Sequence, residues 1–98
     1  MAQFIALLRR NYDEFPEPQF TPALMEAEAE QARSLYTAGV FRQIWSRGDL
    51  PGAAVLLEAT SADEALAALE TLPLKKLNML TLDTLVPANP YRGFTPRG

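Results

Sequence analysis

The residues best suited to chemistry are an Arg-x-x-Trp motif and two isolated carboxylates. Arg42 and Trp45 lie three positions apart, while Glu58 and Asp83 each interrupt an otherwise apolar segment. A guanidinium binds a carboxylate through paired hydrogen bonds, and an indole ring offers a flat apolar wall. Desolvation inside an apolar segment raises the pKa of a carboxyl group toward the range useful for proton transfer. The sequence therefore predicts that Arg42 and Trp45 bind a small anionic organic molecule, and that Glu58 or Asp83 moves a proton on it.

Each of these residues also has a structural interpretation. A Trp on a strand is more typical of a core or a subunit interface than of a ligand site. Arg42 could pair with a nearby acid, Glu58 or Asp83, and the two acids could equally lie exposed at strand ends. Tyr12 is a further candidate binding residue, because it follows the first apolar segment, where a loop could cover the mouth of a pocket. The adjacent Asp13 is equally well explained by a turn.

The absence of two residue types limits the chemistry further. The chain contains no Cys and no His, which excludes thiolate chemistry, His-dependent triads and metals ligated by Cys or His. Any acid–base chemistry therefore falls to carboxylates, Tyr or Lys. The sequence has no phosphate-binding glycine loop either, so we expect neither a cofactor nor a metal.

Composition sets the class of protein. With 98 residues the chain is long enough for one domain. Nine Lys and Arg against twelve Asp and Glu give a net charge of −3, which is the wrong sign for binding nucleic acid. Residues 1–8 are too short an apolar run for a signal peptide, and no apolar stretch reaches the roughly 18 residues of a membrane span. We therefore expect a cytoplasmic protein that binds neither nucleic acid nor membranes.

The residue pattern predicts four strands and two helices. The strands are expected at residues 3–9, 40–47, 53–60 and 78–86, and the helices at 23–38 and 62–72. Thr21-Pro22 marks the start of the first helix, and a capping box at Ser61 marks the start of the second. Residues 10–20 are expected to form a long loop.

The order βαββαβ is typical of a ferredoxin-like α+β sandwich, in which helices cover one face of an antiparallel sheet. The first helix is predicted to pack on this sheet through Met25, Ala29 and Ala32. Its run of glutamates is predicted to face solvent: Glu26, Glu28 and Glu30.

The second face of the sheet is predicted to be partly apolar as well. Side chains alternate across a strand, so Leu80 and Leu82 are expected under the helices and Met79 on the open face. The same alternation places Leu56 on the open face. Because a monomer would expose these residues, we expect a homodimer or a higher homo-oligomer that buries this face.

A single domain is therefore expected over residues 1–86, followed by an extended arm over 87–98. The arm contains three Pro and two Gly, a composition typical of an extended segment. Tyr91 and Phe94 are its only large apolar residues, and they have no place in a two-layer core. We expect the arm to lie across a neighbouring subunit.

Several motifs together resemble the muconolactone isomerase family. They are Arg42-x-x-Trp45 preceded by Gly39, the segment Ser61-x-Asp63-Glu64, the tripeptide Leu72-Pro73-Leu74, and a last strand that runs into a Pro-containing tail. The resemblance covers residues 3 to 90, nearly the whole chain. Only the first motif could carry chemistry, because a capping box and a helix stop explain the next two. The chain differs from the family at Asn89-Pro90, where the family usually has a His before Pro, and at Val40-Phe41, where it tends to carry a basic–aromatic pair.

The resemblance implies a dimeric α+β barrel and a cofactor-independent isomerase of aromatic catabolism that moves a proton within a small unsaturated lactone or oxo acid. In this interpretation Arg42 holds the substrate carboxylate between the open sheet face and the partner subunit, and Glu58 or Asp83 carries the proton. The alternative is a non-catalytic small-ligand-binding or accessory protein with the same fold, which the absence of the family's His favours. A cofactor-free oxygenase of the same superfamily is a third interpretation.

Overall fold

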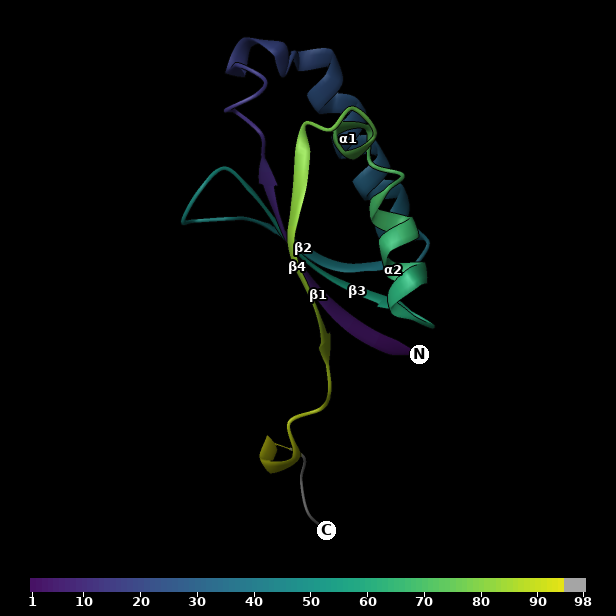
Figure 1. Cartoon of the computed structure of the whole chain (residues 1–98). Helices are drawn as coiled ribbons and strands as arrows, with labels where there is room; N and C mark the ends of the chain where they lie inside the picture. Colours follow the sequence, from purple (N-terminus) through teal and green to yellow (C-terminus); the bar gives the residue numbers. More distant parts are fainter. Residues whose placement is uncertain (95–98) are drawn as a thin grey trace.

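A four-stranded antiparallel sheet with helices on one face forms the body of the chain (Figure 1). The computed structural model describes residues 1–94. The elements are β1 (Ala2–Arg10), a 3-10 turn (Glu17–Gln19), α1 (Pro22–Thr37), β2 (Phe41–Ser46), β3 (Gly52–Ala59), α2 (Ala62–Leu69), α3 (Pro73–Lys76), β4 (Leu80–Ala88) and a second 3-10 turn (Arg92–Phe94). The strand order β2-β3-β1-β4 is compatible with a ferredoxin-like fold. The predicted α+β fold, with helices on one face of an antiparallel sheet, is therefore confirmed.

Both long helices begin where the sequence places their caps. The hydroxyl oxygen of Thr21 accepts a hydrogen bond from the backbone N–H of Leu24 at 3.2 Å, and Pro22 follows at the first helical position. The hydroxyl oxygen of Ser61 accepts from the N–H of Glu64 at 3.1 Å. These contacts satisfy backbone donors that the helices themselves leave unpaired.

The element boundaries differ from the expected ones in the second half of the chain. α2 ends at Leu69, and Pro73 begins an additional helical turn, α3, in a stretch expected to be a simple connection. β4 begins at Leu80 and continues past the expected end of the domain through Pro87. A proline is tolerated there because β4 is an edge strand, where its missing N–H removes little pairing.

Met79 lies in the core and not on the open face, so this part of the predicted face assignment is wrong. Its exposed fraction is 4%. Asn78 before it has a φ of 60°, so the chain turns at this point and the alternation of β4 begins only at Leu80. Leu80 and Leu82 pack against the core, as predicted.

The core lies between the sheet and the pair α2 and α3. The helix-facing side chains of β1 and β3 are almost fully buried: Phe4, Ala6, Leu8, Val55, Leu57 and Ala59. Opposite them, α2, α3 and their connection bury Ala65, Leu69, Leu72 and Leu74. α1 contributes no fully buried residue, so its packing on the sheet is incomplete.

The open face of the sheet carries apolar side chains on several adjacent strands. In the strand register, Ile5 of β1 lies between Leu56 of β3 and Val86 of β4. Leu7, two residues further along β1, lies in the row that ends at Trp45 of β2. Ile5, Trp45 and Val86 are 41%, 52% and 45% exposed. These five residues are called the open-face patch below, and Leu56 lies in it as predicted.

The chain leaves the sheet after Ala88 and runs away from the body (Figure 1). Tyr91 is 77% exposed, so it lies outside the core, as predicted. The predicted role of Phe94 depends on a side chain that lies outside the described residues. The contact of the arm with a neighbouring subunit stays a prediction.

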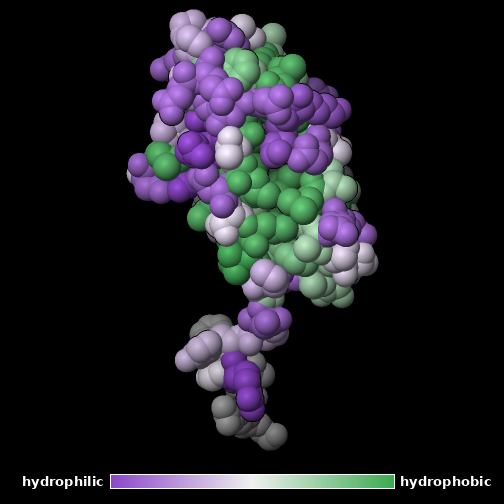
Figure 2. Space-filling view, viewed as in Figure 1, coloured by the Kyte–Doolittle hydropathy of each residue, from purple (hydrophilic) through white to green (hydrophobic). Residues whose placement is uncertain are grey.

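The surface is unevenly divided between apolar and hydrophilic residues. Figure 2 shows an apolar area over the middle of the molecule, at the level of α2 and β4, and hydrophilic residues around the end at which α1 begins. Within residues 1–94, no helix combines the length and the apolar character needed to cross a membrane.

Candidate functional site

A cavity of about 460 Å³ lies between α1 and the helix-facing side of the sheet. Ala29 and Ala32 of α1 and the facing Gly52 and Ala53 of β3 line it, and because these residues are small they leave space between helix and sheet. Gly52 cannot carry a larger side chain, because a Cβ there would clash with the carbonyl oxygen of Leu8. The volume lies within the range of about 300–1,000 Å³ found for small-molecule sites, and the wall is mostly apolar.

Glu28 places a carboxyl group on the wall of this cavity. The side chain is partly buried, and this burial raises the pKa of Glu28 above its ordinary value. Two weaker effects lower the pKa of Glu28. The backbone N–H of Leu74 donates a hydrogen bond to Oε1 at 2.9 Å, and the positive charge of Arg10 favours the ionised carboxylate. Since desolvation exceeds both, the pKa of Glu28 is raised overall.

Arg10, the last residue of β1, adds a cation to the same wall. Its Nη1 donates a hydrogen bond to the hydroxyl of Tyr12 at 2.9 Å. Its Cζ lies 5.9 Å from the ring centroid of Phe20, whose ring packs edge-on against that of Tyr12 with the centroids 4.8 Å apart. Tyr12, predicted to bind the ligand at a pocket mouth, is thus placed to hold an arginine that lines the cavity.

Arg42, the predicted carboxylate anchor, lies outside this cavity. A register shift between Phe41 and Gln43 makes Arg42 the extra residue of a β-bulge in β2, an irregularity that redirects side chains. Its Nη1 lies 3.8 Å from Oε2 of Glu58. The ion pair considered as the alternative role of Arg42 is therefore present.

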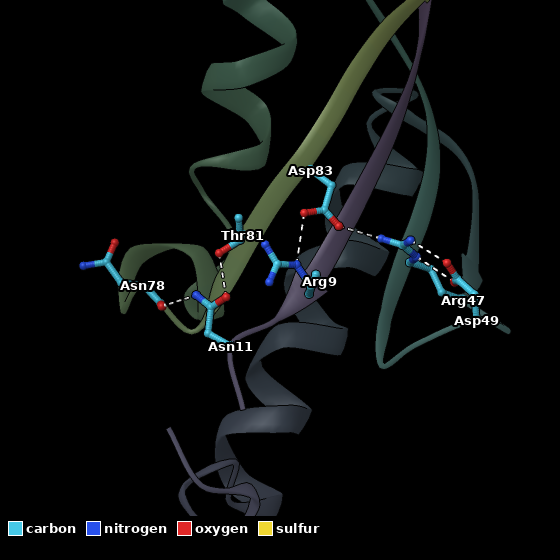
Figure 3. Close-up of polar contacts among 7 residues, drawn as sticks. All are labelled: Arg9, Asn11, Arg47, Asp49, Asn78, Thr81 and Asp83. Atoms are coloured by element: carbon cyan, nitrogen blue, oxygen red, sulfur yellow. Dashed lines mark hydrogen bonds and ion pairs between the residues drawn. The ribbon is translucent and has the colours of Figure 1, made fainter. Parts of the chain in front are cut away.

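Asp83 is held between two arginines on the open face (Figure 3). Nη1 of Arg47 lies 2.9 Å from Oδ2, and Nε of Arg9 lies 3.0 Å from Oδ1. Arg47 also pairs with Asp49 at 2.7 Å. The hydrogen bonds from Arg47 and Arg9 lower the pKa of Asp83 below its ordinary value, so the predicted upward shift is wrong for this residue. Its apolar neighbours in sequence count for less than the two cations that the fold brings to it.

The structure does not bring the predicted residues together in one site. Trp45 of the edge strand β2 borders the cavity but belongs to the open-face patch, and Glu58 and Asp83 also lie on the open face, away from the cavity. The charged residues on the cavity wall are Arg10, Glu28 and Arg33, and most of the wall is apolar. Among the residues that the structure describes, no group of three or more His, Cys, Asp or Glu is placed to hold a metal ion.

Sequence reasoning missed Glu28, and its assignment to the solvated side of α1 is wrong. Glu28 lies three residues after Met25 and four before Ala32, and both of these also line the cavity. Positions at this spacing share one side of a helix, so the signal was present in the sequence. The alternating run of glutamates concealed it, because Glu26 and Glu30 are exposed as predicted.

Comparisons with known proteins assign no residue roles here. No protein-family model matches the sequence, and no curated protein matches it. The roles of Arg10 and Glu28 are therefore inferred from the cavity itself.

Proposed function

We propose that this chain is an enzyme that moves a proton within a small unsaturated lactone or oxo acid bound in the cavity under α1. The reaction is of the muconolactone isomerase type and requires no cofactor. The observation that carries the proposal is Glu28, a partly buried carboxyl group of raised pKa on the wall of a mostly apolar cavity. A carboxylate whose pKa is raised is a stronger base than an exposed one, and after accepting a proton from carbon it can return that proton as an acid.

One carboxyl group suffices for a balanced reaction. The ionised Glu28 takes the proton from a carbon next to the substrate carbonyl, and the released electron pair delocalises over the conjugated system as a dienolate. The protonated Glu28 then returns this proton to a different carbon of the same system, and the double bond moves. Electrons and protons are conserved, so the reaction consumes no oxidant or reductant. Between the two steps the carboxyl proton of Glu28 can exchange with water, because this side chain is only partly buried.

A small-ligand-binding protein without catalysis is the second candidate, and one contact favours it. The N–H of Leu74 that donates to Glu28 joins α1 to the start of α3, so the same carboxylate is suited to bracing the two helices. In that case the cavity still holds a ligand, but Glu28 exchanges no proton with it.

Hydrogen exchange in heavy water separates these candidates. A panel of small unsaturated lactones and oxo acids is incubated with the protein in D₂O, and loss of each C–H signal is followed by proton NMR. We expect the wild type to exchange one C–H of at least one compound, and Glu28→Gln to lose about 100-fold or more of that rate. Glu30→Gln is the matched control, because Glu30 is exposed on the same helix and should not affect the rate. Unchanged exchange in Glu28→Gln refutes the proposal, and ligand binding without exchange in the wild type supports the second candidate.

We also propose that two copies of the chain pack through the open-face patch, giving the dimeric α+β barrel that the family resemblance implies. The exposure of Ile5, Trp45 and Val86 in the single chain supports this arrangement. Two sheets packed face to face would remove these side chains from water, which is the main driving force for association. A self-complementary patch of this kind suits a two-fold dimer.

A further inference from the structure

We propose that Arg10 recognises the anionic group of the ligand, and that the cavity under α1 selects small monocarboxylates. The inference rests on the proposed function only in assuming that the ligand binds in this cavity, and it does not require Glu28 to be catalytic. It gives Arg10 the anchoring role that the sequence suggested for Arg42, which lies outside the cavity.

Arg10 differs from the neighbouring arginines in having no carboxylate partner. The chain has five arginines between residues 9 and 47. Four of them have a carboxylate oxygen within 4.0 Å: Arg9, Arg33, Arg42 and Arg47. Arg10 has none within residues 1–94, although its side chain is partly buried in the cavity wall. A cation in such surroundings gains most from an anion that enters with a ligand.

The guanidinium of Arg10 is positioned before any ligand arrives. The hydroxyl of Tyr12 accepts from Nη1 at 2.9 Å, and the guanidinium lies over the ring of Phe20, which is itself buried. The backbone N–H of Arg10 donates to the carbonyl of Pro51 at 3.0 Å, which fixes the end of the strand as well. The Tyr12 contact uses one of the five N–H donors of the guanidinium. A donor group held in this way loses little conformational freedom when it binds a carboxylate.

The surroundings of Arg10 favour ligands that carry one negative charge on an otherwise apolar carbon skeleton. One unpaired cation on a mostly apolar wall matches a single carboxylate, whereas a phosphate ester carries a charge of about −1.5 to −2 near neutral pH. Arg33 also lines the cavity, but it already pairs with Glu26 at 2.7 Å. Glu28 faces the same cavity and is near enough to Arg10 for that positive charge to lower its pKa, but within residues 1–94 no ion pair of 4.0 Å or less joins the two side chains. The carbon skeleton of a carboxylate bound to Arg10 can therefore extend toward Glu28.

Calorimetric titration with matched acids and amides tests the inference. The probes are sorbate, benzoate and cinnamate, each compared with its neutral amide, and they are titrated into the full-length wild type and its variants. We expect the wild type to bind at least one acid about 10-fold or more tightly than the amide. In Arg10→Met the affinity for that acid should fall about 10- to 100-fold, with the amide unchanged. Arg10→Lys should keep part of the preference, because it keeps the charge without the planar fork.

Arg42→Met is the matched control, because it removes a guanidinium that lies outside the cavity and is paired with Glu58. This variant should keep the preference for acids. A folded Arg10→Met that also keeps the preference overturns the inference. If Arg10→Met does not fold, Tyr12→Phe replaces it, since this change removes the hydroxyl that holds Arg10 and keeps the ring. A preference reduced severalfold in Tyr12→Phe supports the inference, and an unchanged one overturns it.

The wild-type titrations distinguish failure of this inference from failure of the proposed function. Equal binding of acids and amides in the cavity overturns the role of Arg10 and leaves the cavity as the ligand site. Binding of neither class overturns the role of Arg10 together with the proposed use of the cavity. Displacement of a bound acid by its amide shows that both bind at one site, which supports the inference when the acid binds more tightly and Arg10→Met weakens only the acid.

Discussion

Filling the cavity under α1 should stabilise the protein and abolish ligand binding at the same time. Ala32 lies on the cavity wall, and Ala32→Leu adds three carbons there. At about 0.8 kcal/mol for each buried carbon the gain is at most about 2.4 kcal/mol. Ordering the Leu side chain costs about 0.5–1 kcal/mol. The free energy of unfolding should therefore rise by about 1.5 kcal/mol, which for a chain of this size raises Tm by roughly 6–12 °C.

Urea unfolding and thermal melting measure the stability, and calorimetric titration measures ligand binding. Ala27→Leu is the matched control, because it makes the same change on the exposed side of α1 and shares any effect on helix propensity. We expect this control to change the free energy of unfolding by less than about 0.5 kcal/mol. A loss of stability in Ala32→Leu would mean that α1 packs directly on the sheet, which refutes the reasoning. A gain in stability with unchanged binding would place the ligand site elsewhere.

Three further changes test the charge and surface assignments. Glu28→Gln should raise the free energy of unfolding at neutral pH, measured with urea. Burial raises the pKa of Glu28 in the folded chain, so the folded state binds more protons than the unfolded state. The ionised carboxylate therefore destabilises the fold most at neutral pH, and this effect disappears as the pH falls through the raised pKa. A difference that stays constant with pH would contradict this assignment. Leu56→Glu should convert the proposed dimer to a monomer in light scattering, whereas Leu66→Glu on the exposed surface of α2 should leave it intact; dissociation in both would argue against the open-face patch. Ser61→Ala removes the acceptor for the N–H of Glu64 and should cost about 1 kcal/mol in urea unfolding, and an unchanged midpoint would show that the cap adds nothing.

The sequence predicts the elements well because their signals are local. Thr21 and Ser61 cap the helices where the sequence places them, since capping involves only the next few residues. The predicted face of Met79 is wrong because Met79 precedes the first residue of β4 and directly follows Asn78, whose positive φ turns the chain. The positive φ of Asn78 depends on how the chain enters β4 after α3, and the residue type alone does not predict it.

The candidate site was harder to predict because it depends on pairing between distant residues. Asp83 looks like an isolated acid in an apolar strand, yet Arg9 reaches it across 74 positions of sequence. A register shift in β1 and β4 next to Asp83 places the carboxylate for this contact. The helical spacing of Glu28 was visible, but whether a space lies beneath it depends on the distance at which α1 packs.

Arg9 and Arg10 are adjacent in β1 but have different surroundings and partners. Side chains alternate across the sheet, so these adjacent arginines face opposite sides of β1. Arg9 meets Asp83 on the open face, where the charges neutralise one another and the patch beside them can pack against a second copy without burying an unpaired charge. Arg10 meets Tyr12 and the apolar cavity, and its ion-pairing capacity stays available. Two residues of the same type thus have different partners because of the face that each one occupies.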